Sequence, residues 1–442
     1  MATDPRWYNV KTMETLIYRI KSLIPNWLLS VIRPPYHFAL AWIGAAWYRH
    51  PSKRLTIIAV TGTKGKSTTV ELINAILTTA GYKTASLSTI QFKIGDETTP
   101  NLYKMTTPGR FFVQRFLHLA TEAGCTHAVI EMTSEGVKQF RHKFIELDAL
   151  VFTNLTPEHI ESHGSFEKYK EAKLQIAGQL ALSSKRPRYM VANQDDEHGQ
   201  DFLETAVEHP LPYSLKDLEL HTLHKDGVAL IFKEKGEEIT IRVSLVGLFN
   251  VYNALAAITM TRALGVSWTH IEKALSTLEK VAGRVEHLHS PRGANKPITA
   301  IVDYAHTPDS LEKLYQAFGD QPKVCVLGNT GGGRDHWKRP EMGKIAEKYC
   351  DQIILTNEDP YDENPRKIVE EMASAIEDKA RLEIIMDRRL AIRRAIELTP
   401  AGGYMLISGK GTDPYIMGAD GSRQPWSDAK VVEEELARAA IE

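Results

Sequence analysis

The sequence is poor in cysteine and has no excess of charge of either sign. Only three cysteines occur in 442 residues, at positions 125, 325 and 350, and none belongs to a CxxC pair. Their spacing argues against a structural zinc site and predicts a reducing compartment, with the three side chains as buried apolar fillers. The formal net charge is −1, which argues against a nucleic-acid-binding protein or a polyacidic surface.

Neither a secretory signal nor a membrane span is expected. The N-terminal residues lack the order of basic stretch, apolar core and small-residue cleavage site. An apolar, aromatic region runs from Trp27 to Tyr48, but Arg33, Pro34 and Pro35 interrupt it, and residues 38–48 are too short to cross a bilayer. Two interpretations of this region stay open: a helix buried against the next domain, or an interfacial helix that makes peripheral membrane contact through residues 27–48.

What the chain does contain is the pattern of a large α/β protein. A length of 442 residues predicts two or three domains. Apolar strands that alternate with helices predict mainly parallel sheets, whereas residues 220–245 alternate apolar and polar residues like antiparallel strands. A polar, Pro- and Gly-containing stretch at 290–297 indicates a boundary. We therefore expect a short helical region (1–54), a central P-loop ATPase domain (55–289) and a C-terminal Rossmann-like α/β domain (290–442).

The stretch after the first expected strand is typical of a phosphate-binding loop. Residues 55–61 predict a buried strand and residues 67–80 a helix, and a Gly-rich segment lies between them, although Val60 replaces the first glycine of the full pattern. Its backbone would wrap phosphate oxygens, its lysine would bridge the terminal phosphates and its serine would bind Mg²⁺. The expected ATP-binding residues are Gly62, Thr63, Lys64, Gly65, Lys66, Ser67 and Thr68.

A second cluster of polar residues follows two later strands. Glu131 ends the strand expected at 128–132, His159 and His163 follow the strand expected at 149–154, and Lys173 lies on the next helix. Ligands gather at the carboxyl ends of parallel strands. A carboxylate and imidazoles near a phosphate loop can hold a second divalent ion, although a lone histidine is more often a structural residue.

Further short segments follow in a consistent order along the rest of the chain. They are Thr106-Thr107-Pro108; Glu131, Ser134, Gln139 and Arg141; Phe152-Thr153-Asn154-Leu155; His163-Gly164; residues 169–173; Phe249-Asn250-Val251 with Asn253; residues 283–286; residues 303–308; Gly333-Arg334-Asp335; Lys338-Arg339-Pro340; and Gly409-Lys410-Gly411. In this order they resemble the Mur ligases, and among them the MurE-type enzymes that add the third residue of the peptidoglycan stem peptide.

The resemblance implies an ATP-dependent amide ligase in which ATP activates a carboxylate as an acyl phosphate and an amino acid's amine displaces the phosphate. It implies catalytic roles for Lys66, Glu131, His163, Lys173, Arg334 and Asp335. It adds to the ATP site Asn250, Asn253, Arg284, Asp303, Tyr304 and His306. It implies acceptor binding by Thr106, Thr107, Pro108, Ser134, Gln139 and Arg141. It implies Mg²⁺ binding by Ser67, Glu131, His163 and a carbamylated Lys173.

The amino-acid pocket departs from the family's pattern. The resemblance assigns it Arg334, Glu358, Asp359, Tyr361, Gly409, Lys410 and Asp413. Glu358-Asp359-Pro360-Tyr361 replaces the Asp-Asn-Pro-Arg of enzymes that add meso-diaminopimelate, and Thr412-Asp413 replaces His-Glu. Because acids surround an uncharged Tyr361, an ammonium side chain is favoured, from lysine or another diamine such as ornithine. The alternative is that these acids form only a solvated loop face.

Other departures leave the acceptor open. Lys64 stands where most Mur ligases carry Asn, Glu135 replaces a common His, and residues 1–54 are shorter than the uridine-binding domain of MurE-type enzymes. The acceptor is therefore either UDP-linked, which the retained segment 106–108 favours, or lipid-linked. Rival interpretations are a folylpolyglutamate synthase, a cyanophycin-type or pseudomurein-type ligase, and a non-catalytic nucleotide-binding partner. We expect a cytoplasmic monomer that uses ATP and Mg²⁺ with a UDP-muramyl-dipeptide and a free amino acid.

Overall fold

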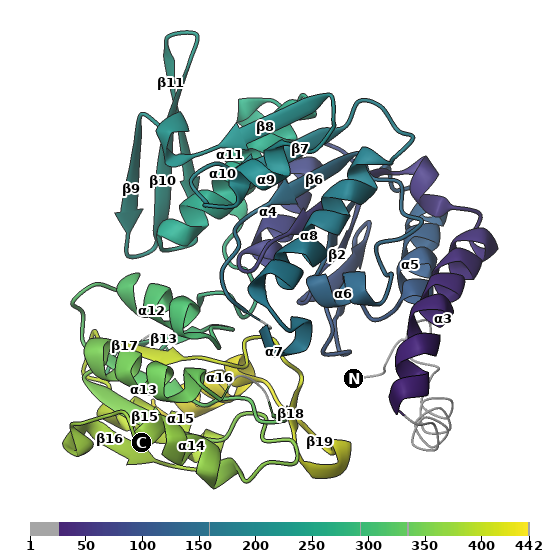
Figure 1. Cartoon of the computed structure of the whole chain (residues 1–442). Coiled ribbons are helices and arrows are strands. Elements are labelled where there is room, and N and C mark those ends of the chain that lie inside the picture. The colour runs from purple at the N-terminus through teal and green to yellow at the C-terminus, as the bar shows by residue number, and fades with distance from the viewer. Residues whose placement is uncertain (1–25, 159, 292, 334–335, 441–442) are drawn as a thin grey trace.

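The computed structural model describes residues 26–158, 160–291, 293–333 and 336–440. Two α/β units follow one another along the chain, each built on a mainly parallel sheet, and a long N-terminal helix lies along the outer side of the first unit (Figure 1). The expected α/β class with mainly parallel sheets is confirmed.

The first unit contains an eight-stranded sheet in the order β4-β3-β2-β5-β1-β6-β7-β8. Its strands are β1 (Thr56–Thr61), β2 (Thr84–Leu87), β3 (Gln91–Ile94), β4 (Glu97–Pro100), β5 (His127–Glu131), β6 (Ala149–Phe152), β7 (Tyr189–Asn193) and β8 (His209–Tyr213). β5 and β6 run parallel to β1 on its two sides, while β3 and β4 form an antiparallel edge. The carboxyl ends of β1, β5 and β6 therefore lie side by side, where ligands gather in such sheets.

Helices cover both faces of this sheet, which explains the unbroken apolar sequences of its central strands. One face packs against α4 (Lys66–Thr79), α10 (Leu248–Ala263) and α11 (Trp268–Thr277), and the other against α5 (Arg110–Glu122), α8 (Phe166–Ala181) and α9 (Gly199–Leu203). Short helices α6 (Ser134–Lys138) and α7 (Ile160–His163) follow β5 and β6. The expected antiparallel segment is confirmed as a separate sheet of β9 (Leu220–His224), β10 (Gly227–Glu234) and β11 (Glu237–Val243).

The second unit contains a six-stranded sheet in the order β12-β13-β17-β14-β15-β16. Its strands are β12 (Glu286–His289), β13 (Thr299–Val302), β14 (Lys323–Leu327), β15 (Gln352–Leu355), β16 (Leu382–Ile384) and β17 (Tyr404–Ile407). Its helices are α12 (Pro308–Gln316), α13 (Lys338–Tyr349), α14 (Pro365–Ala373), α15 (Arg388–Leu398) and α16 (Asp428–Ala439). A small hairpin of β18 (Tyr415–Met417) and β19 (Arg423–Pro425) follows β17.

The polar stretch 290–297 does not separate the two sheets. It connects β12 to β13, which pair antiparallel within the second sheet. Its Pro and Gly residues therefore belong to a loop between two neighbouring strands, and β12 already belongs to the C-terminal sheet.

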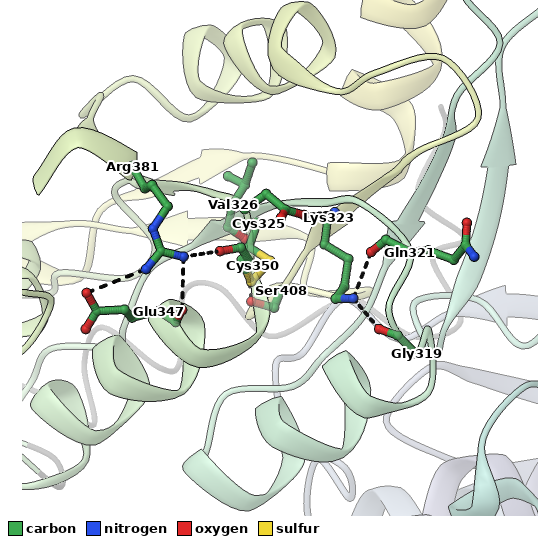
Figure 2. Close-up of a disulfide and its surroundings, with 10 residues drawn as sticks. Gly319, Gln321, Lys323, Cys325, Val326, Glu347, Cys350, Arg381 and Ser408 are labelled. Atoms are coloured by element: carbon green, nitrogen blue, oxygen red, sulfur yellow. Dashed lines mark hydrogen bonds and ion pairs between the residues drawn. A yellow bond between two sulfur atoms is a disulfide. The ribbon is translucent and has the colours of Figure 1, made fainter. Parts of the chain in front are cut away.

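The cysteines differ from expectation. Cys325 on β14 and Cys350, directly after α13, form a disulfide with a Cα–Cα distance of 6.0 Å, whereas Cys125 is free and buried as expected. The two residues are 25 positions apart, but α13 packs back against β14 and brings them together (Figure 2). Arg381 donates hydrogen bonds to the carbonyl groups of Glu347 and Cys350 beside the bond. Both residues of the pair are buried, as expected of apolar fillers, but the cysteine spacing gave no indication of the bond between them.

The N-terminal helix α3 (Asn26–Trp47) runs through Pro34 and Pro35, the two prolines that interrupt the apolar stretch of residues 27–48. Each proline removes one N–H from the helical hydrogen-bond ladder. The segment beyond the prolines is stabilised by packing, because Ala41 and Ala45 are buried and α3 lies against α5. Within the described ranges, no helix is long and apolar enough to cross a membrane.

Candidate functional site

The expected phosphate loop connects β1 to α4. Gly62 has φ 148° and Gly65 has φ 80°, a region of backbone conformation that favours glycine. A Cβ on Gly62 would lie 2.0 Å from Thr153 Oγ1, and a Cβ on Gly65 would lie 2.2 Å from Asn253 Oδ1. Close packing and backbone conformation therefore both require glycine here, and the loop lies against β6 and α10.

Lys66, Ser67 and Glu131 meet where α4 begins. The Ser67 hydroxyl donates to Glu131 Oε2 at 2.8 Å, and Lys66 Nζ lies 3.9 Å from Glu131 Oε1. Lys66 Nζ also donates to the carbonyl of Thr63 at 2.9 Å. Burial lowers the pKa of Lys66. A polyanion bound at this helix N-terminus would meet backbone N–H groups and the ammonium together.

Lys173 reaches the same loop from α8. Its side chain is 2% exposed, and its Nζ donates to the carbonyl of Gly62 at 2.6 Å and lies 4.8 Å from the ring centroid of Tyr169. Burial, and next the neighbouring Lys66, hold the pKa of Lys173 well below its usual range. The lowered pKa favours the neutral amine form of Lys173, which is the nucleophilic form.

His163 lies at the end of α7, against the start of α6. Its Nε2 is 3.1 Å from Ser134 Oγ and 3.2 Å from Glu135 Oε1, and burial lowers its pKa, which favours the neutral imidazole that binds metals. In the part of the chain that the structure describes, no group of three or more His, Cys, Asp or Glu side chains is arranged to hold a metal ion. The expected ligands are of mixed type: a hydroxyl, a carboxylate, an imidazole and an amine.

A chain of charged groups connects the phosphate loop with the C-terminal unit. Lys64 Nζ lies 2.9 Å from Glu158 Oε1, and His306 Nε2 lies 3.2 Å from the same oxygen. Glu158 is buried, with 8% of its surface exposed. Lys64, which replaces the usual Asn, therefore has a carboxylate partner that His306 of the second unit shares.

The other expected ATP-site residues surround this contact. Asn253 is buried on α10 beside Gly65 and donates to Asn250 Oδ1 at 2.9 Å. Asp303 accepts hydrogen bonds from the backbone N–H groups of Val285 and Ala305 at 2.8 and 2.6 Å. The Arg284 guanidinium lies 4.6 Å from the ring centroid of Tyr304. Both units thus contribute to one polar region.

The expected acceptor residues lie beside Glu131. Thr106 Oγ1 is 2.8 Å from Thr89 Oγ1, and the Thr89 N–H donates to Glu131 Oε2 at 3.0 Å. Arg141 donates to the carbonyl of Thr107, in the loop that also contains Pro108, and to Gln139 Oε1 at 2.8 Å.

A second arginine adds to the positive charge of this cluster. Arg110, the first residue of α5, donates to the carbonyl of Gln139 at 3.0 Å. Burial, and next the charge of Arg110, lower the pKa of Arg141 to about 10. Two guanidinium groups this close favour a bound anion.

The acids of the expected amino-acid pocket have partners within the protein. Asp359 Oδ1 lies 2.9 Å from Lys410 Nζ and accepts from the Met417 N–H at 2.8 Å, and its other oxygen pairs with Lys104. Asp413 Oδ2 lies 3.2 Å from Lys104 Nζ.

The remaining acids of this pocket also have partners within the protein, but Glu358 Oε2 is buried without a hydrogen bond to any described residue. Glu358 accepts from the Thr330 hydroxyl, Asp362 from the Asp420 N–H, and Glu363 pairs with Arg339. A Cβ on Gly409 would lie 2.2 Å from Glu358 Oε2, and Tyr361 has φ 51°. Part of the negative charge expected here is therefore already paired within the protein. The alternative of a merely solvated loop face is wrong for Glu358 and Asp359, which are buried.

Three expected residues, His159, Arg334 and Asp335, lie outside the described residues. Lys104, Arg110 and Glu158 were missed. Lys104 lies two positions before the segment 106–108, and Glu158 belongs to the histidine-containing stretch. No local sequence pattern distinguishes either residue from an ordinary surface charge. Their partners are distant in the sequence, with 255 positions between Lys104 and Asp359.

Comparison with known proteins agrees with this geometry. Residues 60–261 match the Mur ligase middle domain, and residues 283–411 match the Mur ligase, glutamate ligase domain. The chain is 36% identical over 413 residues to the UDP-N-acetylmuramoyl-L-alanyl-D-glutamate–2,6-diaminopimelate ligase of Syntrophomonas wolfei, covering 91% of this chain and 82% of that relative.

Solved structures share the fold. A UDP-N-acetylmuramoyl-L-alanyl-D-glutamate–2,6-diaminopimelate ligase aligns with a TM-score of 0.61 at 28% identity, covering 89% of this chain and 82% of that one. A folylpolyglutamate synthase of Mycobacterium tuberculosis in complex with ADP aligns with a TM-score of 0.65 at 16% identity, covering 84% and 92%, which shows a common fold alone. The chain belongs to the Mur ligase family of ATP-dependent amide-forming ligases.

Proposed function

We propose that this ligase adds a diamino acid to the terminal carboxylate of UDP-N-acetylmuramoyl-L-alanyl-D-glutamate in peptidoglycan synthesis. The γ-phosphoryl group of ATP passes to a carboxylate oxygen, which leaves ADP and an acyl phosphate. The amine nitrogen then attacks the carbonyl carbon, the carbon–oxygen bond to phosphate breaks, and the amine loses a proton. The observation that carries this proposal is a pair of charged contacts that join the two units. Lys64 of the phosphate loop and His306 share Glu158, and Lys104, beside the acceptor segment 106–108, pairs with Asp359 and Asp413.

The loop and its neighbours fit ATP and Mg²⁺. Lys66 supplies a cation for the terminal phosphates, and Gly62, Thr63, Lys64, Gly65, Ser67 and Thr68 supply the cradle. Mg²⁺ would be held by the oxygens of Ser67 and Glu131, already 2.8 Å apart, and would neutralise phosphate charge, while His163 would help to bind a second Mg²⁺. Asn250, Asn253, Arg284, Asp303, Tyr304 and His306 complete the nucleotide site, where the second unit excludes water.

Lys173 fits the role of a carbamylated lysine. A neutral lysine amine combines with CO₂ to form a carbamate and releases one proton, so a neutral group becomes an anion. Burial of Lys173 next to Lys66 favours the neutral amine that this reaction requires. The product would bring a negative oxygen group beside Lys66 and Glu131, where the described residues otherwise supply few ligands for a second metal ion.

The acceptor would bind along α5 and α6. Thr106, Thr107, Pro108, Ser134, Gln139 and Arg141 provide hydrogen bonds, and Arg110 and Arg141 provide two cations for the anionic acceptor. Glu358, Asp359, Tyr361, Gly409, Lys410 and Asp413 would form the amino-acid pocket. Arg334 keeps its proposed role in binding the amino acid, and Arg334 and Asp335 keep their proposed catalytic roles, although both lie outside the described residues. We further propose that the chain works as a monomer in the cytoplasm.

The proposal predicts phosphate release that requires both co-substrates. ATP would be supplied with UDP-N-acetylmuramoyl-L-alanyl-D-glutamate and, separately, lysine, ornithine or meso-diaminopimelate, and the product would be identified by its mass. We expect turnover with at least one diamino acid and none without the acceptor. A lipid-linked form of the same acceptor and a folate with glutamate serve as comparisons. Turnover with folate alone, or phosphate release indifferent to the acceptor, would overturn the proposal.

Peripheral membrane contact is a second proposal, carried by α3. Ile32, Tyr36, Ile43 and Trp47 follow a helical spacing that places them together on the side opposite the buried Ala41, and they are 46%, 49%, 41% and 75% exposed. The helix contains no Asp or Glu, and exposed basic residues accompany it: Arg33, Arg49, Lys53 and Arg54. Exposed aromatic and apolar side chains flanked by cations suit the interface of an anionic lipid surface.

We predict that the full chain co-floats with vesicles of equal parts phosphatidylglycerol and phosphatidylcholine, less so in high salt. Replacing both Ile43 and Trp47 by serine should weaken vesicle binding at least about tenfold, because two large apolar side chains no longer enter the interface. Trp337→Ser, at a tryptophan 55% exposed in the second unit, is the control and should bind as the unmodified chain does. Absence of binding by the unmodified chain would exclude this surface as a membrane contact.

A further inference from the structure

Lys104 stands at the contact between the two units, within the amino-acid pocket. It lies between β4 and α5, next to the acceptor segment 106–108, while its partners Asp359 and Asp413 follow strands of the C-terminal sheet. Its Nζ also lies 5.8 Å from the ring centroid of Tyr361. Lys104 has φ 55°, a left-handed conformation that costs a non-glycine residue free energy and that persists where surrounding contacts hold it.

The charges around Lys104 are nearly enclosed. The side chains of Lys104, Asp359, Lys410 and Asp413 are 15%, 4%, 0% and 12% exposed. Burial alone would lower the pKa of Lys104, but Asp413 and Asp359 raise it, so the side chain stays charged. Burial alone would raise the pKa of Asp359, but Lys410 and Lys104 lower it. The pocket therefore contains fixed charges of both signs.

The two aspartates of this cluster differ in how fully their carboxylate oxygens are already paired. Asp359 is saturated, because Lys410, Lys104 and the Met417 N–H occupy its two oxygens. Asp413 is more exposed, and its cations lie farther away, Lys104 at 3.2 Å and Lys410 at 3.5 Å. A substrate side chain that reaches this cluster meets Lys104 and Asp413, one cation and one anion about a hydrogen bond apart.

We propose that Lys104 is a specificity-determining residue that selects a diamino acid whose side chain ends in both an ammonium and a carboxylate, over one that ends in an ammonium alone. This inference rests on the proposed function and its amino-acid pocket. A side chain with both groups gives Lys104 a carboxylate partner and Asp413 an ammonium partner. The ammonium of lysine can pair only with Asp413, and it meets the like charge of Lys104 at close range. Lys410 is already paired with Asp359 and the Tyr415 carbonyl, and Tyr361 carries no charge, so the cation that meets the substrate comes from the acceptor-binding unit.

The test compares kcat/KM for meso-diaminopimelate and for lysine, with UDP-linked acceptor and ATP held saturating. The unmodified enzyme should favour meso-diaminopimelate. Lys104→Met should reduce that preference about tenfold to a hundredfold, because the charged contact to the substrate carboxylate is lost. The change should appear as a higher KM for meso-diaminopimelate together with a lower KM for lysine, since Asp413 no longer pairs with Lys104 and can pair with the lysine ammonium. If Lys104 had only a structural role, Lys104→Met would lower kcat/KM for both amino acids by a similar factor.

Two further variants keep the test decisive. Lys104→Arg retains a cation and should retain the preference for meso-diaminopimelate, so it separates charge from folding if Lys104→Met is unstable. Lys225→Met, at an exposed lysine of the β9–β10 turn, is the control and should match the unmodified enzyme. The inference is wrong if the unmodified enzyme prefers lysine. It is also wrong if Lys104→Met keeps the full preference for meso-diaminopimelate, or if Lys104→Arg loses that preference. Failure of the unmodified enzyme with every diamino acid would instead overturn the proposed function.

Discussion

Replacement of Lys66 by methionine is expected to lower kcat for ligation at least about a thousandfold. Lys66 is buried at the N-terminus of α4, and no water can replace its charge beside the transferring phosphoryl group. Methionine has a similar length, so the loop should keep its shape while losing the cation. The measurement is ADP formation with saturating ATP, acceptor and amino acid, together with a thermal unfolding curve that checks the fold.

Lys64→Met is the matched control for this variant. Lys64 lies in the same loop, but its side chain is 25% exposed and is paired with Glu158. Its loss should reduce kcat by no more than about tenfold, the effect of one partly exposed charge. If Lys66→Met loses no more activity than Lys64→Met, Lys66 does not stabilise the phosphoryl group in the way proposed.

The region around the phosphate loop was predictable because its order is local. A buried strand, two glycines, a lysine and a helix follow one another within residues 56–79, and the strands that carry Glu131 and the segment 149–152 pair directly with β1. Parallel pairing places the carboxyl ends of neighbouring strands together whatever the intervening loops contain. The position of these side chains at that edge could therefore be predicted from sequence alone.

The amino-acid pocket was less predictable because its charges are set by distant partners. The acids at 358–363 looked open to a ligand in the sequence, yet Asp359 pairs with Lys410 and with Lys104, the latter in the other unit. A count of acids in one loop cannot reveal cations that another sheet supplies. Local residue type therefore indicates that a pocket is polar, but the sign of its free charge depends on tertiary contacts.

Two features of the fold depend on helix packing and could not be predicted from local sequence patterns. Prolines 34 and 35 end helices in most settings, but α3 continues, and beyond the prolines Ala41 and Ala45 are buried on the side that packs against α5. The absence of a CxxC pair gave no sign of the bond between Cys325 and Cys350, which depends on how α13 returns to β14. Both differences arise from contacts between elements rather than from any short pattern.

Loss of Lys173 is expected to lower kcat about a hundredfold to a thousandfold, as removal of one preorganised charged group does. Lys173→Ala cannot form a carbamate, so the site keeps the cation of Lys66 but lacks the anion proposed beside it. Intact-mass measurement of the unmodified enzyme under native conditions should show added mass equal to one CO₂, and Lys173→Ala should lack it. Removal of bicarbonate should lower the activity of the unmodified enzyme, and its return should restore it.

The control is Lys170→Ala on the same helix. Lys170 pairs with Asp201 at 2.7 Å on the surface of α8, so its loss should leave both the CO₂ adduct and kcat nearly unchanged. A carbamate acts through its carboxylate oxygens, and for that reason acetate or formate should restore part of the activity of Lys173→Ala but add nothing to Lys170→Ala. An inactive Lys173→Ala that these anions do not rescue, in a chain with no CO₂ adduct, would mean that Lys173 acts as a plain amine through its hydrogen bond to Gly62.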